Sequence, residues 1–285
     1  MTNNIFKRFL LPVLLLVFVT SFITPNSAEA AITGNNSPNT ASLMGYWKYS
    51  RPDTTILPEG ENEAYYQFTI NKGERVYVRS SYGKQYTGMK IEVYNSKYSD
   101  ERTRVIDPDS VIPFIFANTG EVTSTTETYF VKVTRGTYTG NMYFTVSIQD
   151  RIKSGNGKFN FTGAATNWGN SSLNFLGVDS SVITMDLTNH TAIPRNAIVK
   201  SITTNSTQTP DQGGVTHKLM ADDNKIWNQS IYSSATSGSY RISIQDQLKV
   251  AQKWSFKYNA KATVKSTMRN VNADIRYEYD VTDGF

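Results

Sequence analysis

The fold of the first half of this chain is decided by one stretch, Glu63-Ala64-Tyr65-Tyr66-Gln67-Phe68-Thr69-Ile70. Its apolar and aromatic side chains return at every second position from Ala64 to Ile70, which is the spacing of a β-strand with one buried face. The turn-forming residues Asn71-Lys72-Gly73 follow. They predict a hairpin that leads into a second strand around Val76 and Val78.

The same alternation recurs up to residue 150, and Gly and Asn separate one run from the next. The runs are Ile91 and Val93, then 111–116, then Tyr129, Val131 and Val133, and finally Met142, Phe144, Val146 and Ile148. No window shows a persuasive helical period. Short strands with turns between them predict an antiparallel β-sandwich over 46–150.

A break in the pattern at 151–158 combines glycines and cations with one sizeable apolar residue, and it predicts a short linker. Alternation then resumes over 159–285, in runs that include Phe159 and Phe161, Ile183, Met185 and Leu187, Val215, His217 and Leu219, and Tyr240, Ile242 and Ile244. His217 should point into the core, because it shares the face of Val215 and Leu219. We therefore predict an all-β protein of two antiparallel, jelly-roll-like β-sandwich domains.

The first 30 residues have the pattern of a secretory signal peptide. Lys7 and Arg8 precede the apolar run 9–23, and Ala28-Glu29-Ala30 has the small residues of a cleavage site. We expect residues 1–30 to be removed and the protein to be secreted and extracellular, or associated noncovalently with the cell surface. Residues 31–45 are rich in Asn, Ser, Thr and Gly, and they predict a flexible leader.

Composition excludes several classes of site. The chain has no cysteine, which rules out disulfides, thiolate metal sites and a cysteine nucleophile. Its net charge of +5, from 29 Lys and Arg against 24 Asp and Glu, is only mildly basic. An exported chain without cysteine resembles a bacterial secretion product. No recognisable RNA-stacking or helix-turn-helix pattern occurs, so we expect no nucleic-acid partner.

The first half resembles the bacterial pre-peptidase C-terminal domains and the related collagen-binding domains of secreted collagenases. The resemblance rests on Glu63–Ile70 with Lys72-Gly73, Lys90-Ile91-Glu92-Val93-Tyr94, Thr128-Tyr129-Phe130-Val131-Lys132-Val133 and Gly140-Asn141-Met142-Tyr143-Phe144-Thr145-Val146. It implies a small β-sandwich that binds or solubilises without catalysis. Gly88 and Met89 stand where the family places an acidic residue, so the resemblance does not carry calcium binding over to this chain.

A row of cations in the second half is the first candidate binding site. The members are spaced four residues apart, and no acidic residue interrupts them between Asp246 and Asp274: Lys249, Lys253, Lys257, Lys261, Lys265 and Arg269. Residues four apart share one face of a strand. A turn near Asn259-Ala260 would set two such rows side by side and give a positive sheet face suited to an anionic polymer. The alternative is that these lysines only keep a sheet surface soluble.

A second candidate surface lies in the first half. Arg75, Tyr77 and Arg79 share the polar face of one predicted strand, and Tyr94 lies on the polar face of another. Tyrosine and arginine are enriched where proteins bind partners, although half-buried tyrosines are also ordinary sheet residues. Three tryptophans among small polar residues, Trp47, Trp168 and Trp227, could stack on sugar rings or could fill the core or its rim.

Catalytic chemistry has little support in the sequence. The two histidines, His190 and His217, lack metal-ligand spacing, and no G-x-S-x-G nucleophile motif occurs. Asp107-Pro108-Asp109 and Asp222-Asp223-Asn224 match plain turns better than a calcium loop. We expect no enzyme activity, no metal and no cofactor.

These observations predict a secreted bacterial binding protein that engages an anionic or fibrous extracellular polymer through its sandwich faces. The expected partner is a polysaccharide, a teichoic-acid-like polymer or a matrix protein. The alternative is a toxin-like, pore-forming β-protein that inserts strands into membranes, supported by the Ser and Thr alternation from Ser180 to Thr209. Only under this alternative is a membrane the partner. The sequence does not fix the oligomeric state.

Overall fold

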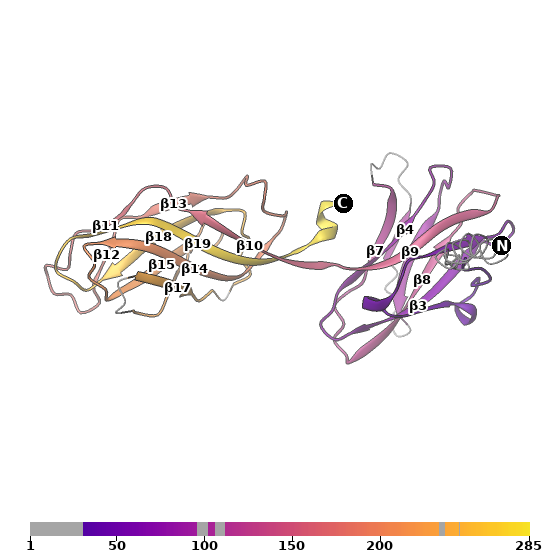
Figure 1. Ribbon diagram of the computed structural model, residues 1–285, viewed down its shortest axis with the longest axis horizontal. Helices are drawn as coiled ribbons and strands as arrows, with labels where there is room; N and C mark the ends of the chain where they lie inside the picture. Colours follow the sequence, from indigo (N-terminus) through magenta and orange to yellow (C-terminus); the bar gives the residue numbers. More distant parts are fainter. Residues whose placement is uncertain (1–30, 96–101, 106–111, 234–236, 245) are drawn as a thin grey trace, which may run out of the picture. The chain divides into compact units, whose positions relative to one another are not determined.

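The computed structural model describes residues 31–95, 102–105, 112–233, 237–244 and 246–285. The expected signal peptide, residues 1–30, lies outside this range. The regular secondary structure of the described residues is almost wholly β-strand, arranged in four sheets, which confirms the all-β prediction (Figure 1). Its helical elements are short 3-10 turns, η1 (Pro38–Thr40), η2 (Trp47–Tyr49) and η3 (Val281–Gly284).

The first half contains two of the sheets. One has the strand order β1 (Ser42–Tyr46), β3 (Glu63–Asn71), β8 (Thr126–Thr134), β5 (Lys90–Asn95) and β6 (Arg102–Val105). The other has the order β2 (Asp53–Leu57), β9 (Met142–Asp150), β4 (Val76–Ser81) and β7 (Phe114–Asn118). Ala64, Phe68 and Ile70 of β3 are buried, as the alternation predicts. Burying one face of each strand removes apolar area from water, and this stabilises the layered arrangement.

The predicted hairpin at Asn71-Lys72-Gly73 is wrong. Strands β3 and β4 belong to different sheets, so the chain crosses from one layer to the other at this turn. The backbone N–H of Lys72 donates to the carbonyl of Thr125 at 3.0 Å, and the N–H of Gly73 donates to the carbonyl of Val122 at 2.8 Å. Turn residues signal that the chain reverses, but they do not tell whether the next strand pairs or crosses.

Residues 31–45, expected to be a flexible leader, are instead hydrogen-bonded to the first sandwich. Strand β1 pairs in parallel with β3, and Ile32 exchanges backbone hydrogen bonds with the edge of β2 at Thr54 and Ile56. The buried amide of Asn35 donates to the carbonyl of Tyr65 at 2.8 Å. The polar composition that suggested flexibility therefore supplies hydrogen-bonding groups to a strand edge.

A buried arginine joins loops of the first half. The guanidinium of Arg135 donates to the backbone carbonyls of Glu61 at 2.6 Å and of Leu57 and Tyr138 at 3.2 Å, and also to those of Pro58 and Gly140. A buried charge is costly unless its donors are satisfied. These carbonyls satisfy the guanidinium and hold the 57–61 and 138–140 segments in place.

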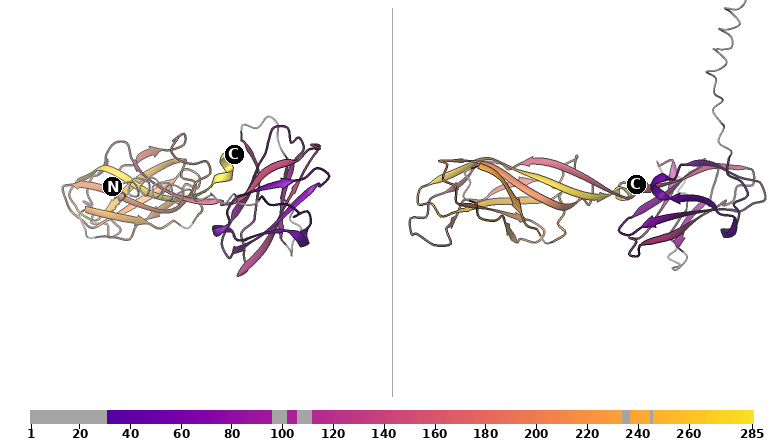
Figure 2. Two further views of the ribbon diagram at one scale, coloured as in Figure 1. Left: turned by 45° about the vertical axis from the view of Figure 1, so that its right-hand side comes forward. Right: turned by 60° about the horizontal axis from the view of Figure 1, so that its bottom comes forward.

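The second half also has two sheets. One has the order β10 (Ile152–Asn160), β19 (Ser266–Asp280), β14 (Ile198–Thr209) and β17 (Ser237–Ile242), with β11 (Ala165–Asn167) also paired to β19. The other has the order β12 (Val178–Asp179), β18 (Lys253–Ala260), β15 (Val215–Ala221) and β16 (Trp227–Gln229), with β13 (Ile183–Asp186) also paired to β18. The views in Figure 2 show this half as layered strands.

The core of the second half lies between these sheets. Trp254, Phe256 and Tyr258 of β18 are fully buried and pack in one cluster with Ile202 of β14 and Ile275 of β19. Their alternation with Lys253, Ser255 and Lys257 matches the sequence prediction. The outward side of β18 therefore carries polar and charged side chains.

The predicted linker at 151–158 lies within a strand. Strand β10 pairs antiparallel with the end of β19, from Ile152 opposite Asp280 to Asn160 opposite Asn272. Gly155 lies under the ring of Tyr277, and Gly157 lies under that of Phe159; a Cβ at either position would overlap the ring. The glycines that suggested a linker thus leave space on β10 for one aromatic ring of β19 and one of β10 itself.

The chain packs as two compact units. The first holds the described residues up to Thr69 together with Arg79–Phe116 and Thr128–Ser147. The second holds Ile70–Val78, Ala117–Glu127 and Ile148–Phe285. The domain boundary expected at 151–158 stays a prediction.

Candidate functional site

The predicted row of cations is divided between two sheets and does not form one face. Lys253 and Lys257 lie on the outward side of β18, whereas Arg269 lies on β19 in the other sheet. Lys261 and Lys265 lie in the segment that crosses from β18 to β19. The expectation of two adjacent rows is wrong, because the chain after Asn259-Ala260 changes sheets and does not turn back beside β18.

One part of the row forms an ordered charged cluster. The carboxylate of Asp179 accepts hydrogen bonds from the ammonium groups of Lys218 at 2.8 Å and Lys257 at 2.7 Å, and from the amide of Asn259 at 2.9 Å. The side chains of Lys218, Lys257 and Asp179 are only 21%, 18% and 31% exposed. Burial alone would raise the pKa of Asp179, but hydrogen bonds from these three donors lower it to about 2. The carboxylate of Asp179 is thus ionised at neutral pH.

An indole ring lies beside this cluster. The ammonium nitrogen of Lys257 is 4.3 Å from the centroid of the Trp227 ring, which is a cation–π contact. Lys218 lies opposite Lys257 in register, and Lys253 lies opposite Asp186. We call the outward side of β12, β13, β18, β15 and β16 the charged face. Its charged side chains are three lysines, Lys218, Lys253 and Lys257, and two aspartates, Asp179 and Asp186, so it carries a net charge of +1.

Two further lysines of the row, Lys261 and Lys265, lie beside aromatic rings. The ammonium nitrogen of Lys265 is 4.0 Å from the ring centroid of Trp168, and that of Lys261 is 5.3 Å from the ring centroid of Tyr232. The Trp168 side chain is 74% exposed. Of the three tryptophans considered for sugar stacking, Trp168 and Trp227 therefore reach the surface, while Trp47 is buried.

The candidate residues of the first half do not come together as one surface. Arg75, Tyr77 and Arg79 lie at β4, whereas Tyr94 lies on β5 in the other sheet. Arg75 pairs with Glu121, and Arg79 donates to the hydroxyl of Ser147 at 3.0 Å.

The two tyrosines of this group are also occupied. Tyr77 is buried on an inner strand, so a partner could not reach its ring. Tyr94 stacks on Phe130 of β8 with ring centroids 5.6 Å apart. Polymer binding by Arg75, Tyr77, Arg79 and Tyr94 stays a prediction, and the geometry does not favour it.

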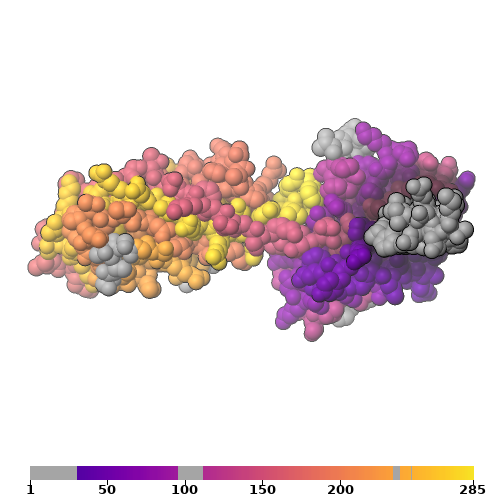
Figure 3. Space-filling model, in the orientation of Figure 1, coloured from indigo at the N-terminus to yellow at the C-terminus, as the bar shows by residue number. Residues whose placement is uncertain are grey.

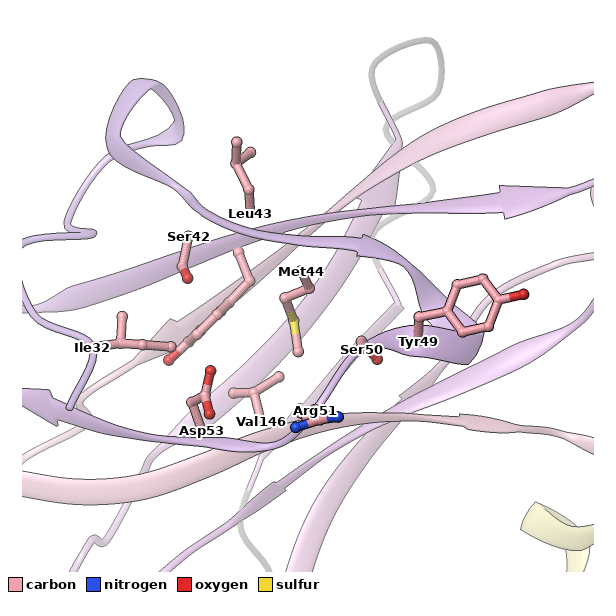
Figure 4. Close-up of a pocket in the computed structure, with 10 residues that line it drawn as sticks. Ile32, Ser42, Leu43, Met44, Tyr49, Ser50, Arg51, Asp53 and Val146 are labelled. Carbon is pink, nitrogen blue, oxygen red and sulfur yellow. The ribbon is translucent and has the colours of Figure 1, made fainter. Parts of the chain in front are cut away.

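A cavity of about 210 Å³ lies in the first half beside β1 and β2. Figure 4 shows Met44 and Asp53 pointing toward it, while Leu43 points away. The Oδ1 atom of Asp53 is buried and has no hydrogen-bond partner among the described residues. A water molecule or a small hydroxyl group in the cavity would satisfy this oxygen.

His217 belongs to the core, as predicted. Its Nδ1 atom is 2.8 Å from the hydroxyl of Thr204, and its ring stacks on Tyr240 at a centroid distance of 3.7 Å. Burial lowers the pKa of His217 to about 3. His190 is exposed and packs edge-on against Phe159. Within the described residues no three His, Cys, Asp or Glu side chains are grouped so that they could hold a metal ion. Asp107-Pro108-Asp109 lies outside those residues.

The stretch behind the membrane-inserting alternative is packed into the second sandwich. Within Ser180–Thr209, β13 pairs with β18, and β14 pairs with β17 on one side and β19 on the other; residues 187–197 connect the two strands. No helix in the described part of the chain is long and apolar enough to cross a bilayer.

A comparison with curated proteins identifies the family. The chain is 54% identical over 284 residues to the uncharacterized protein YbdN of Bacillus subtilis (strain 168), which covers 98% of this chain and 99% of YbdN. The chain belongs to the YbdN family. YbdN is similar in sequence to both halves, because the match runs through nearly the whole length. No family model matches the chain.

Two solved structures are distant likenesses. The pre-peptidase C-terminal domain of collagenase from Bacillus anthracis is 14% identical, covers 38% of this chain and 94% of its own, and has a TM-score of 0.29. A protein from Eubacterium rectale is 8% identical, with coverage of 88% and 85% and a TM-score of 0.38. The first likeness is to the family that the strands of the first half resemble. At these scores neither carries an argument about the function of this YbdN relative.

Sequence reasoning missed Asp179 and Lys218, the partners that order Lys257. They come from β12 and β15, far from β18 in sequence, so no local pattern links them. It also missed the loop 168–177. The sequence of this loop places four large apolar residues in a stretch rich in Asn and Ser without strand alternation, and such a pattern could have indicated exposed apolar side chains.

Proposed function

We propose that this protein acts outside the cytoplasm as a non-catalytic binding protein whose charged face holds an acidic polysaccharide. The single observation behind the proposal is the cluster in which Lys218, Lys257 and Asn259 surround Asp179 beside Trp227. Such a group offers cations to a carboxylate or phosphate, an acceptor to sugar hydroxyls, and an indole to a sugar ring. The expected signal peptide supports an extracellular setting.

The geometry of the cluster favours specific recognition of a ligand over nonspecific electrostatic attraction of a polyanion. The three charged side chains sit on strands, are largely buried and are held by hydrogen bonds, so little conformational entropy is lost when a ligand binds. The net charge of the face is only +1, so long-range attraction of a polyanion is weak. Affinity should therefore depend on Trp227 as well as on the lysines.

The test is binding of the protein, starting at Ala31, to immobilised polygalacturonate and to teichoic acid, with dextran as the neutral control. We expect binding to the acidic polymers and at least a tenfold loss in Trp227→Ala and in the double variant Lys218→Gln/Lys257→Gln. Lys200→Gln is the matched control, because Lys200 forms an exposed ion pair with Glu278 at 3.0 Å on another sheet. Equal binding by all variants would refute the proposed face.

A further inference from the structure

The loop 168–177, between β11 and β12, presents apolar side chains to solvent. The exposed fractions are 74% for Trp168, 74% for Leu173, 80% for Phe175 and 65% for Leu176. The loop contains no charged residue. Clustered exposed apolar side chains of this size mark a site of interaction with a protein or a membrane.

Two asparagine side chains of this loop, Asn170 and Asn174, pair with its backbone, and that of Asn170 points inward. The side chain of Asn170 is buried, accepts from the N–H of Asn174 at 2.8 Å and donates to the carbonyl of Asn174 at 2.7 Å. The side chain of Asn174 accepts from the N–H of Leu176 at 3.0 Å, and the carbonyl of Asn174 accepts from the N–H of Gly177 at 2.8 Å. These backbone groups are therefore already paired before any partner binds.

Leu173 is held in an uncommon backbone conformation. Its φ of 53° lies in the left-handed region, which bulky side chains rarely adopt. Its N–H donates to the carbonyl of Asn170 at 3.0 Å. The loop thus keeps a leucine on its outer side where Asn or Gly would be less strained.

A basic segment lies against the loop. The N–H of Asn170 donates to the carbonyl of Ala262 at 2.8 Å, which joins the loop to residues 261–265. That segment adds Val264, which is 60% exposed, and the exposed cations Lys261 and Lys265. At the left end of the space-filling view, atoms coloured for both segments lie at the surface (Figure 3). We call residues 168–177 and 261–265 the apolar tip.

We infer that the apolar tip docks into the surface of an anionic lipid bilayer without crossing it. Leu173, Phe175 and Leu176 enter the boundary between headgroups and acyl chains, and Trp168 lies at the interface, where indoles concentrate. Lys261 and Lys265 pair with anionic headgroups. A lipid fits better than a protein, because the tip combines uncharged apolar side chains, pre-paired backbone groups and flanking cations.

The test uses the protein starting at Ala31 and vesicles of phosphatidylcholine with an equal part of phosphatidylglycerol. We expect co-sedimentation with these vesicles, weaker binding to pure phosphatidylcholine, quenching of Trp168 by brominated lipid, and no release of a trapped dye. Replacing the three apolar side chains together, in Leu173→Asn/Phe175→Ser/Leu176→Ser, should lower partitioning about 100-fold. Lys261→Gln and Lys265→Gln should each lower it about fivefold.

The controls separate this inference from the proposed polysaccharide site. Leu43→Ser removes an apolar side chain that is 77% exposed in the first half, and it should leave vesicle binding unchanged. The triple variant should fold and should still bind polygalacturonate, because Leu173→Asn relieves backbone strain and the charged face is intact. No vesicle binding by the unaltered protein, equal binding by the triple variant, or release of dye would overturn the inference.

Discussion

Acidification should selectively destabilise the second sandwich through His217. An exposed histidine has a pKa of about 6.5, and burial lowers that of His217 to about 3. Below pH of about 6.5 the unfolded chain binds a proton at this ring that the folded chain excludes. The contribution of neutral His217 to the free energy of unfolding is therefore fully present above that pH, and it is lost progressively as the pH drops toward about 3. At ~1.4 kcal/mol per pH unit, moving from pH of about 7 to about 5 removes about 2 kcal/mol.

The assay is urea unfolding followed by tryptophan fluorescence in a Trp47→Phe background. The remaining tryptophans, Trp168, Trp227 and Trp254, all lie in the second half, and Trp254 is buried in its core. His217→Gln is the control, because it keeps a polar side chain but cannot titrate. It should be less stable at neutral pH and should lose the histidine-linked part of the pH dependence. The reasoning fails if the unaltered protein has the same unfolding free energy at both pH values. It also fails if the unfolding free energy of His217→Gln falls between these pH values by as much as that of the unaltered protein.

Three further predictions concern other sites. Arg135→Met should lower the free energy of unfolding of the first sandwich by about 3 kcal/mol in a urea titration, because five carbonyls lose their donor; a loss below about 1 kcal/mol would contradict this. Gly136→Ala should cost at least ~2 kcal/mol in the same measurement, since φ is 76° and the new Cβ would overlap the backbone at Thr87 and Gly88; an unchanged midpoint would count against it. Replacing Lys253, Lys257, Lys261 and Lys265 together by Gln should weaken polygalacturonate binding no more than Lys218→Gln/Lys257→Gln does. Added salt should weaken binding by the unaltered protein. A much larger loss of binding in the quadruple variant would instead support a single binding surface made by the whole row of cations.

Local alternation predicted the buried side chains around the core of the second half, but it placed Tyr77 of the first half on a polar face although that side chain is buried. Trp254, Phe256 and Tyr258 point into the core, and His217 does too, because a strand presents successive side chains to opposite faces. The same pattern says nothing about which strand lies next to which. The hairpin after β3 and the paired rows after β18 were both wrong for this reason, since in each case the chain crosses to another sheet.

Features that depend on distant contacts could not be predicted. Gly155 suggested a linker, yet the ring that covers it belongs to Tyr277 on β19. Lys257 was correctly placed on an outward strand face, but its charge is committed to Asp179, which lies 78 positions earlier in the chain. Pairings of this kind are set by tertiary packing and leave no periodic trace in the sequence.

The guanidinium of Arg135 has a consequence for how the two halves respond to their surroundings. Its five acceptors are backbone carbonyls, which take up no proton in mild acid, so these hydrogen bonds do not compete with protonation of their acceptors. The second half has a neutral imidazole at its centre. A shift toward mild acidity should thus loosen one sandwich and spare the other, and a protease added at low pH should digest the chain from within 159–285 first.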